Sequence, residues 1–285
     1  MPDPIILITG ATGNQGGATI TELLARPARW RIRALVRNPG APKAAALAAR
    51  GVELVQGNLD DERSLRAALT DVYGVLSVQS PMKIGPEGEE RQGRLLATLA
   101  AECGVSHIVQ CSAGGVDRDS GVPHFESKHA IEQQIRTLGL PSTMLRPAAF
   151  MENFATFIFR TTMLSMMKTC LAPGQPMQLV SVRDVGWFAA EAFEHPEQFI
   201  GRAIEIAGDA VTAQQAAGTL RRTGLRPAVM FTIPQGLLNR LPDDFRLMFE
   251  WIAREGFCAD VPALRHEHRG LLTLSDWATN QTAKV

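Results

Sequence analysis

Three glycines at a regular spacing are the first residues of this chain whose pattern predicts chemistry. Gly10, Gly13 and Gly16 come directly after an apolar run over residues 5–9 and open an expected helix over residues 15–25. Glycine permits a tight turn and lets the backbone approach a pyrophosphate closely, while a helix N-terminus presents unpaired N–H groups to the anion. The turn therefore predicts a dinucleotide site, and a glycine-rich turn without a ligand is the alternative. The expected site residues are Gly10, Ala11, Thr12, Gly13, Asn14, Gln15 and Gly16.

An arginine after the expected second strand, residues 31–36, narrows the choice of dinucleotide. Sites that take NAD(H) usually place Asp or Glu here, where the carboxylate binds the ribose 2′-hydroxyl. This chain has Arg37 instead. A carboxylate would repel a 2′-phosphate, whereas a guanidinium can bind it with two hydrogen bonds. Arg37 therefore favours NADP(H) over NAD(H), and the alternative is a solvated arginine at a strand end.

Polar residues also follow the expected third and fourth strands, residues 52–56 and 73–78. Ligands of open α/β sheets lie beyond the carboxyl ends of the strands. Asn58 and Leu59 could line the adenine of a dinucleotide at this edge. Asp61 is equally well explained as the N-cap of the next helix.

The elements that must position these residues alternate regularly over the first 150 residues. Further strands are expected over 107–112 and 142–146, and further helices over 44–50, 64–69, 87–102 and 126–138. Such alternation predicts a Rossmann-type α/β fold, a doubly wound parallel sheet with helices on both faces.

After Pro147 the alternation ends. Residues 150–167 are rich in Met and Phe and look helical, 182–195 are expected to turn into a helix, and 203–206 to form a strand that returns to the sheet. Helices are also expected after Thr212, which forms a capping box with Gln215, and over 245–255, with a last element over 271–278. We therefore expect residues 1–150, together with about 181–207, to form an NADP(H)-binding Rossmann domain. Residues 151–180 and 208–285 would form a smaller, interleaved α/β lobe for a substrate or partner.

Composition excludes several other classes. The 285 residues hold 29 Lys and Arg against 29 Asp and Glu, so the basic surface that nucleic-acid binding needs is not indicated. No run approaches the roughly 18 apolar residues of a membrane span, and no targeting segment is evident, so we expect a cytoplasmic protein. The four cysteines have no metal-ligand spacing and are expected to be reduced and mostly buried. We also expect His266-Glu267-His268 to be a solvated turn rather than part of a metal site.

Several motifs together resemble the NmrA-like family, an atypical branch of the short-chain dehydrogenase/reductases. The matching stretches are residues 10–17, Val36-Arg37-Asn38-Pro39, residues 56–61, 124–128 and 145–147, Phe150-Met151-Glu152-Asn153, and residues 182–186 and 272–277. The resemblance implies that NADP(H) is bound by the glycine turn and by Arg37, Asn38, Asn58, Leu59, Gln79, Ser80, Pro81, Lys128, Phe150, Met151, Glu152 and Asn153.

The catalytic pair of ordinary short-chain dehydrogenases is missing. Those enzymes use Tyr-x-x-x-Lys, but the only tyrosine here is Tyr73, and Ser77 stands four residues later. Lys128 occupies the position of the family's lysine, and His124 lies four residues before it. On a helix that spacing places both on one face, and histidine can donate a proton near neutral pH. His124 and Lys128 are thus the candidate catalytic residues; alternatively, Lys128 holds the cofactor while His124 caps or packs.

The resemblance leaves two functions open. The family contains NADP-binding sensors that regulate transcription without turnover, and NADPH-dependent reductases of quinones, dyes or phenolic compounds. The missing Tyr-x-x-x-Lys favours a redox sensor that acts on a regulatory protein partner. The alternative is an NADPH-dependent reductase of a small apolar acceptor such as a quinone or enone, because hydride transfer to a quinone needs little proton help from the protein.

Overall fold

The computed structural model describes residues 3–27 and 30–283, which form two compact units. The first unit comprises the segment up to Ser112 together with Glu126–Leu145 and Val185–Ile204. The second comprises Ala113–Phe125, Arg146–Asp184 and the chain from Glu205 onward. The predicted functional boundary near residue 150 stays a prediction.

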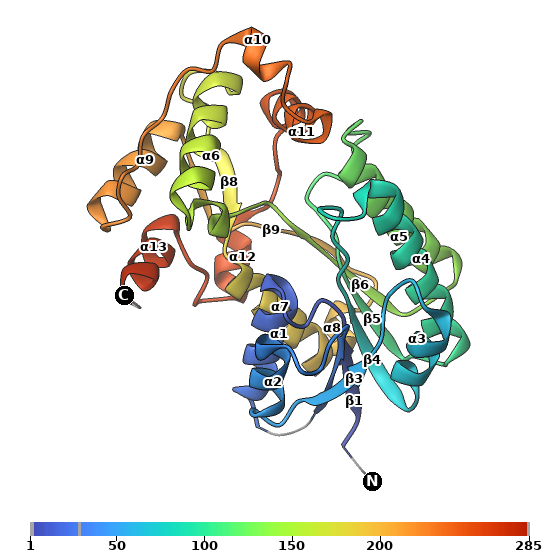
Figure 1. The fold of residues 1–285 in the computed structure, drawn as a ribbon. Helices are drawn as coiled ribbons and strands as arrows, with labels where there is room; N and C mark the ends of the chain where they lie inside the picture. The colour runs from blue at the N-terminus through green and yellow to red at the C-terminus, as the bar shows by residue number, and fades with distance from the viewer. Residues whose placement is uncertain (1–2, 28–29, 284–285) are drawn as a thin grey trace. The chain divides into compact units, whose positions relative to one another are not determined.

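A seven-stranded sheet runs through the fold (Figure 1) in the order β3-β2-β1-β4-β5-β6-β9. Its strands are β1 Ile5–Ile8, β2 Arg31–Val36, β3 Glu53–Gln56, β4 Val72–Ser77, β5 His107–Cys111, β6 Ser142–Pro147 and β9 Ala203–Ile206. β1 pairs in parallel with both β2 and β4. The chain therefore adds β2 and β3 toward one edge of the sheet, then returns to β1 and adds β4, β5 and β6 toward the other edge. Residues 5–8 are fully buried, as an apolar strand covered on both faces must be. The predicted Rossmann-type α/β fold is confirmed.

Helices of the first unit cover the two faces of this sheet. They are α1 Asn14–Leu24, α2 Pro42–Ala48, α3 Glu62–Leu69, α4 Gly85–Glu102, most of α5 Pro123–Thr137, most of α7 Val182–Glu194, and α8 Pro196–Phe199. α3, α4 and α5 lie on one face (Figure 1), where Leu65, Leu96 and Ile131 pack in one buried cluster with Val75 of the sheet. Gly186 lets α7 approach α1 closely, because a Cβ there would lie 2.7 Å from the backbone carbon of Ala18.

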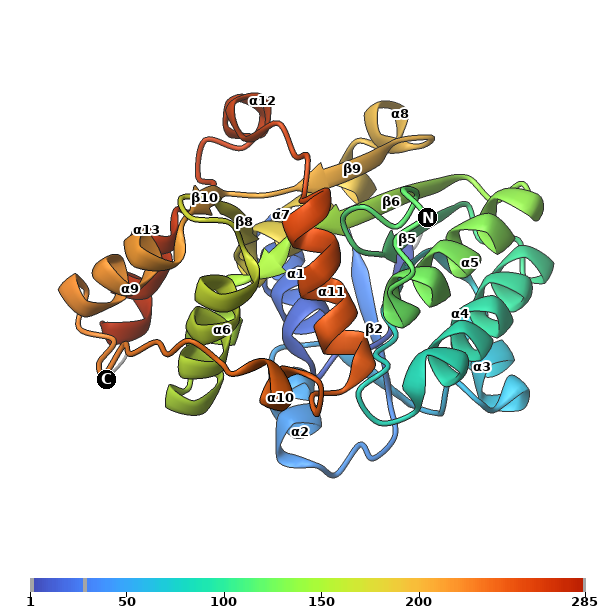
Figure 2. The ribbon, with the colours of Figure 1, turned by 90° about the horizontal axis from the view of Figure 1, so that it is seen from above.

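The second unit has its own small sheet and a core rich in Met and aromatic side chains. Its strands, in the order β10-β8-β7, are β7 Ala149–Phe150, β8 Met177–Val180 and β10 Asp209–Val211. Its helical elements are the 3-10 helix η1 Met151–Phe154, α6 Phe157–Cys170, α9 Ala213–Arg222, α10 Gln235–Leu238, α11 Asp243–Arg254, α12 Val261–Glu267 and α13 Leu274–Thr282. Figure 2 shows α6, α9 and α13 beside β8, and the shared core includes Met163, Leu220 and Trp277.

Three expectations for this part of the chain were wrong. Residues 150–167 are not one helix, because Phe150 belongs to β7, which pairs with β8, and α6 starts only after Thr156 caps it through a hydrogen bond from the Phe159 N–H. His268 is not in a solvated turn: it is buried and lies 3.2 Å from Asp184 Oδ1. The cysteines are free, but Cys103 and Cys258 are exposed rather than buried.

Other local expectations were confirmed. Thr212 and Gln215 form the predicted capping box at the start of α9. Among the helices in the described residues, none combines the length and apolar character needed to cross a membrane.

Candidate functional site

The glycine turn has a geometry that only small residues permit. Gly10 has a φ of +60°, a conformation that residues with a side chain rarely adopt. A Cβ on Gly16 would lie 2.5 Å from the Gly10 carbonyl oxygen, and one on Gly13 would lie 3.1 Å from the same atom. The start of α1 therefore packs directly against the turn, as a pyrophosphate-binding turn requires.

The start of α1 also has the polarity that an anion needs. Its N-cap is Gly13, no side chain within the described residues caps it, and its first turn has no acidic residue. The Gln15 Oε1 atom is buried and has no hydrogen-bond partner among the described residues. Unpaired N–H groups and the helix dipole favour a negatively charged ligand at such an end. The residues present thus fit the pyrophosphate of a dinucleotide.

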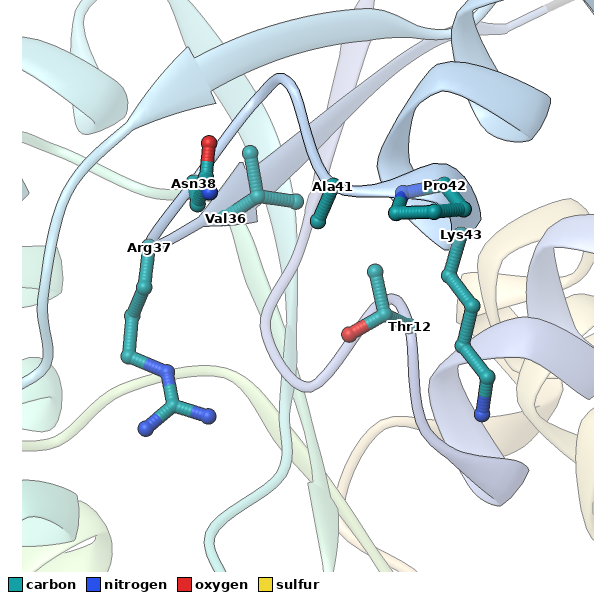
Figure 3. Close-up of a pocket in the computed structure, with 7 residues that line it drawn as sticks. All are labelled: Thr12, Val36, Arg37, Asn38, Ala41, Pro42 and Lys43. Carbon is teal, nitrogen blue, oxygen red and sulfur yellow. The ribbon is translucent and has the colours of Figure 1, made fainter.

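Two cations flank an open hollow beside this turn (Figure 3). The hollow has a volume of about 530 Å³ and is lined by Thr12, Val36, Arg37, Asn38, Ala41, Pro42 and Lys43. Figure 3 shows Arg37 on one side of Thr12 and Lys43 on the other. None of these lining residues is a carboxylate, so the hollow fits a phosphate group. Lys43 was missed in the sequence, although its place at the start of the helix after β2 was a usable signal.

The stretch after β3 combines predicted ligand residues with a helix start. Asp61 is the N-cap of α3, with its side chain accepting a hydrogen bond from the Arg63 N–H, so the capping alternative is confirmed. Asn58 is exposed and Leu59 is half-buried against the core. Their role beside an adenine stays a prediction.

The stretch after β4 carries Gln79, Ser80 and Pro81. Gln79 is buried, and its amide nitrogen donates to the Ser77 hydroxyl at 3.0 Å. Ser80 is exposed and Pro81 is half-buried, so these two are the accessible members of the predicted set. Cofactor contacts by all three stay a prediction.

Lys128 is held by a buried carboxylate of the first unit. Its Nζ lies 2.8 Å from Glu89 Oε1, and the Ser127 hydroxyl donates to Glu89 Oε2 at 2.6 Å. Glu89 is completely buried and Lys128 nearly so. The charge of Lys128 is therefore balanced inside the protein, and the side chain is fixed in position.

The neighbouring Cys111 is not a reactive thiol. Burial raises its pKa to about 12, and the charge of Lys128 opposes that rise only in part. Because the thiolate is the nucleophilic form, Cys111 is unreactive at neutral pH.

His124 is held by a carboxylate of the second unit. Its Nδ1 lies 2.7 Å from Asp244 Oδ1, and its backbone N–H donates to the same oxygen at 2.9 Å. Burial works against ionisation of Asp244, yet the hydrogen bond from His124 lowers the pKa of that carboxyl below its usual value. A carboxylate on one imidazole nitrogen fixes the orientation of the ring. No sequence pattern pointed to Asp244, which lies 120 residues from His124 along the chain.

The predicted cofactor segment 150–153 is engaged by the second unit. Met151 is completely buried in its core. Glu152 accepts hydrogen bonds from the Ser181 hydroxyl, the Val182 N–H and the Trp277 indole N–H. Burial raises the pKa of Glu152, and these bonds oppose the rise. Asn153 is half-buried, and cofactor binding by the segment stays a prediction.

Two other polar residues, His107 and Ser112, are buried at the two ends of β5. His107 is completely buried with Nε2 2.9 Å from the Thr143 hydroxyl, and burial lowers its pKa to about 4, so it is neutral. The Ser112 hydroxyl is buried and finds no hydrogen-bond partner in the described part of the chain. Within that part, no group of three or more His, Cys, Asp or Glu side chains could hold a metal ion.

Comparison with known proteins connects this arrangement to one family. A model described as the NmrA-like family matches residues 2–259. The chain is 30% identical over 226 residues to (4-alkanoyl-5-oxo-2,5-dihydrofuran-3-yl)methyl phosphate reductase of Streptomyces griseus subsp. griseus, covering 78% of this chain and 75% of that protein. The chain spans about half the length of two other curated relatives, both named as NmrA-like family domain-containing oxidoreductases.

Two solved structures share the fold. The NADPH-dependent quinone oxidoreductase QOR2 of Escherichia coli, complexed with NADPH, matches with a TM-score of 0.80 and 24% identity, over 97% of this chain and 99% of that one. NmrA, described as a negative transcriptional regulator, matches with a TM-score of 0.79 and 19% identity, over 99% of this chain and 98% of that one.

Proposed function

Because the chain belongs to the NmrA-like family, we propose that it binds NADP(H) and uses the reduced form to reduce a small acceptor. The observation that carries the cofactor assignment is the hollow beside the glycine turn, which Arg37 and Lys43 flank. A relative that matches over three quarters of its length is named a reductase, which supports turnover rather than binding alone. The substrate in that relative's name is a phosphate ester carried by an oxo-dihydrofuran ring.

Each part of the first-unit site has a distinct role in this proposal. The glycine turn and the first turn of α1 hold the pyrophosphate, with backbone N–H groups as donors. Arg37 and Lys43 neutralise the 2′-phosphate, and Asn58 with Leu59 lines the adenine. Lys128, fixed by Glu89 at 2.8 Å, orients the nicotinamide ribose. When bound, NADPH supplies the hydride that the acceptor receives.

His124 takes the place of the missing tyrosine as the proton donor. Its Nδ1 is held by Asp244, so Nε2 is the atom that delivers the proton. The Asp244 carboxylate compensates the positive charge of the protonated ring and keeps the ring in one orientation. An acceptor whose reduced form is stable as an anion, such as a quinone, needs this proton least.

The rate of NADPH oxidation tests the proposal. The full chain is mixed with NADPH and a panel of neutral and anionic quinones and azo dyes, and absorbance is followed at the NADPH band. We expect acceptor-dependent oxidation. In His124→Gln, kcat should fall about 100-fold or more for azo dyes, whose reduction needs a general acid, and less for quinones. His129→Gln is the matched control, since His129 lies on the same helix and contacts Gln133. NADPH binding without oxidation by any acceptor would contradict the reductase.

A second candidate is an NADP(H)-responsive regulator that acts through a protein partner. It is favoured by one observation: the chain contains no Tyr-x-x-x-Lys, and Tyr73 lies in β4. A regulator would bind NADPH and NADP⁺ with different effects on a partner and would show no acceptor-dependent turnover. The same oxidation assay therefore separates the two candidates.

A further inference from the structure

Arg160 is a buried arginine whose charge has no partner among the residues that the structure describes. It lies in the second turn of α6 and is only 4% exposed. Its Nε and Nη1 atoms are buried and, among the described residues, neither finds a hydrogen-bond partner. Burial lowers the pKa of this guanidinium below its usual value, yet arginine remains protonated at neutral pH. Most of this positive charge is thus buried, and the described residues offer it neither a carboxylate nor a hydrogen-bond acceptor.

Such a charge works against folding, so its retention calls for a ligand. Removing a cation from water without an ion pair or hydrogen bonds is strongly unfavourable. Its place near the N-terminal end of α6 adds to the cost, because the helix dipole favours anions there. The other buried arginine among the described residues, Arg146, is paired: its Nη1 contacts Asp117 Oδ2 at 2.5 Å.

The neighbours of Arg160 on α6 indicate what kind of ligand it would take. The Thr161 hydroxyl is likewise buried without a hydrogen-bond partner in the described residues. Phe157, three residues before Arg160 and four before Thr161, has 49% of its surface exposed. Residues three and four apart lie side by side on a helix surface, so the Phe157 ring is the common neighbour of the Arg160 guanidinium on one side and the Thr161 hydroxyl on the other.

We propose that Arg160 and Thr161 bind the anionic group of the acceptor, a phosphate, carboxylate or sulfonate, while Phe157 packs against its apolar body. The guanidinium supplies the charge and charge-assisted hydrogen bonds to the anion, and the Thr161 hydroxyl is the neutral donor. This inference rests on the proposed function for the identity of the ligand as an acceptor. The binding itself is independent of turnover.

Calorimetric titration of the full chain, with and without NADP⁺, tests the site. The probes are 1-naphthyl phosphate and 1-naphthol, which share an apolar body and differ in the anionic group. We expect the phosphate to bind at least tenfold more tightly than the naphthol, and Arg160→Met to abolish this preference. Arg222→Met is the matched control, because Arg222 is an exposed arginine of the same unit, on α9. Equal binding of the two probes by the wild type would overturn the proposal.

Thermal unfolding separates a binding role from a structural one. Arg160→Met replaces an uncompensated charge with an apolar side chain of similar length, so its Tm should equal or exceed that of the wild type. A marked fall in Tm would show that Arg160 has a structural partner and would also overturn the proposal. Arg160→Lys keeps the charge and should retain part of the preference, which provides a second variant.

A further comparison shows where the phosphate binds. If the preference for 1-naphthyl phosphate disappears in Arg37→Ala and persists in Arg160→Met, the anion occupies the cofactor site and the proposal fails. Preference for the phosphate without any NADPH oxidation would contradict the reductase and leave this site intact. Oxidation of NADPH without a preference for the phosphate would contradict this site and leave the reductase intact.

Discussion

Replacing Arg37 should change the choice of cofactor more than any other single substitution. Arg37 and Lys43 flank the hollow from two sides, and the described residues place no carboxylate in salt-bridge contact with either. A charge-assisted hydrogen bond to a phosphate contributes about 1.5–3 kcal/mol, or a factor of roughly 10 to 150 in affinity. Because Lys43 remains in the single variant, we expect Arg37→Ala to lie near the lower end, about tenfold.

Isothermal titration calorimetry with NADPH and NADH measures this effect. Arg37→Ala should weaken NADPH binding about tenfold and leave NADH binding within about twofold, since NADH lacks the 2′-phosphate that a guanidinium would contact. Adding Lys43→Ala should bring the loss for NADPH to about 100-fold if the two contributions add. Arg31→Ala is the control, because Arg31 lies at the other end of β2 and pairs with Glu53 at 3.3 Å. An equal loss for both cofactors, or none for NADPH, would refute the assignment of Arg37.

Three further variants test other parts of the structure. Gly16→Ala places a Cβ 2.5 Å from the Gly10 carbonyl oxygen, so the turn must shift and the NADPH affinity measured by calorimetry should fall at least tenfold. Gly17→Ala is the control and should leave the affinity unchanged, because its Cβ would have no neighbour closer than 3.6 Å. Asp244→Asn removes the anion that supports His124 and should lower kcat about tenfold or more without changing the Kd of NADPH; an unchanged kcat would argue against the proton donor. His107 has a folded-state pKa of about 4, below its unfolded value, so its contribution to stability is present above about pH 6.5 and is lost as the pH falls. Between pH 7 and pH 5, the free energy of unfolding measured in urea should therefore fall by about 2 kcal/mol less in His107→Gln than in the wild type. An identical pH dependence of the two proteins would contradict this.

The features that the sequence predicted well are set by neighbouring residues. The bounds of β2 and β9 match the expected ones, 31–36 and 203–206, because both are short segments in which buried apolar residues alternate with polar ones. The Thr212 capping box and the Asp61 N-cap depend on residues three or fewer positions apart. The turn between β1 and α1 was likewise predicted from glycines that lie close together in the sequence.

The features that the sequence missed depend on contacts between distant residues. β8 and β10 depend on pairing between distant segments, since β8 pairs with both β7 and β10, and neither strand has a strong pattern of its own. The carboxylates that hold His124 and His268 lie 120 and 84 residues away along the chain. Arg160 lies in a segment whose only evident sequence feature was its content of Met and Phe. Its burial without a partner among the described residues results from packing within the second unit, which the local sequence does not indicate.

Transfer of deuterium from the cofactor tests the reductase directly. The full chain is incubated with NADPH that is deuterated at one or the other face of nicotinamide C4. The acceptor is an enone, which receives the hydride on a carbon atom and keeps the deuterium in the product. The reductase predicts that one of the two labelled cofactors gives a deuterated product by mass spectrometry, in step with NADPH consumption. Tight NADPH binding with no deuterium in any product and no consumption of cofactor would contradict it and favour the regulator.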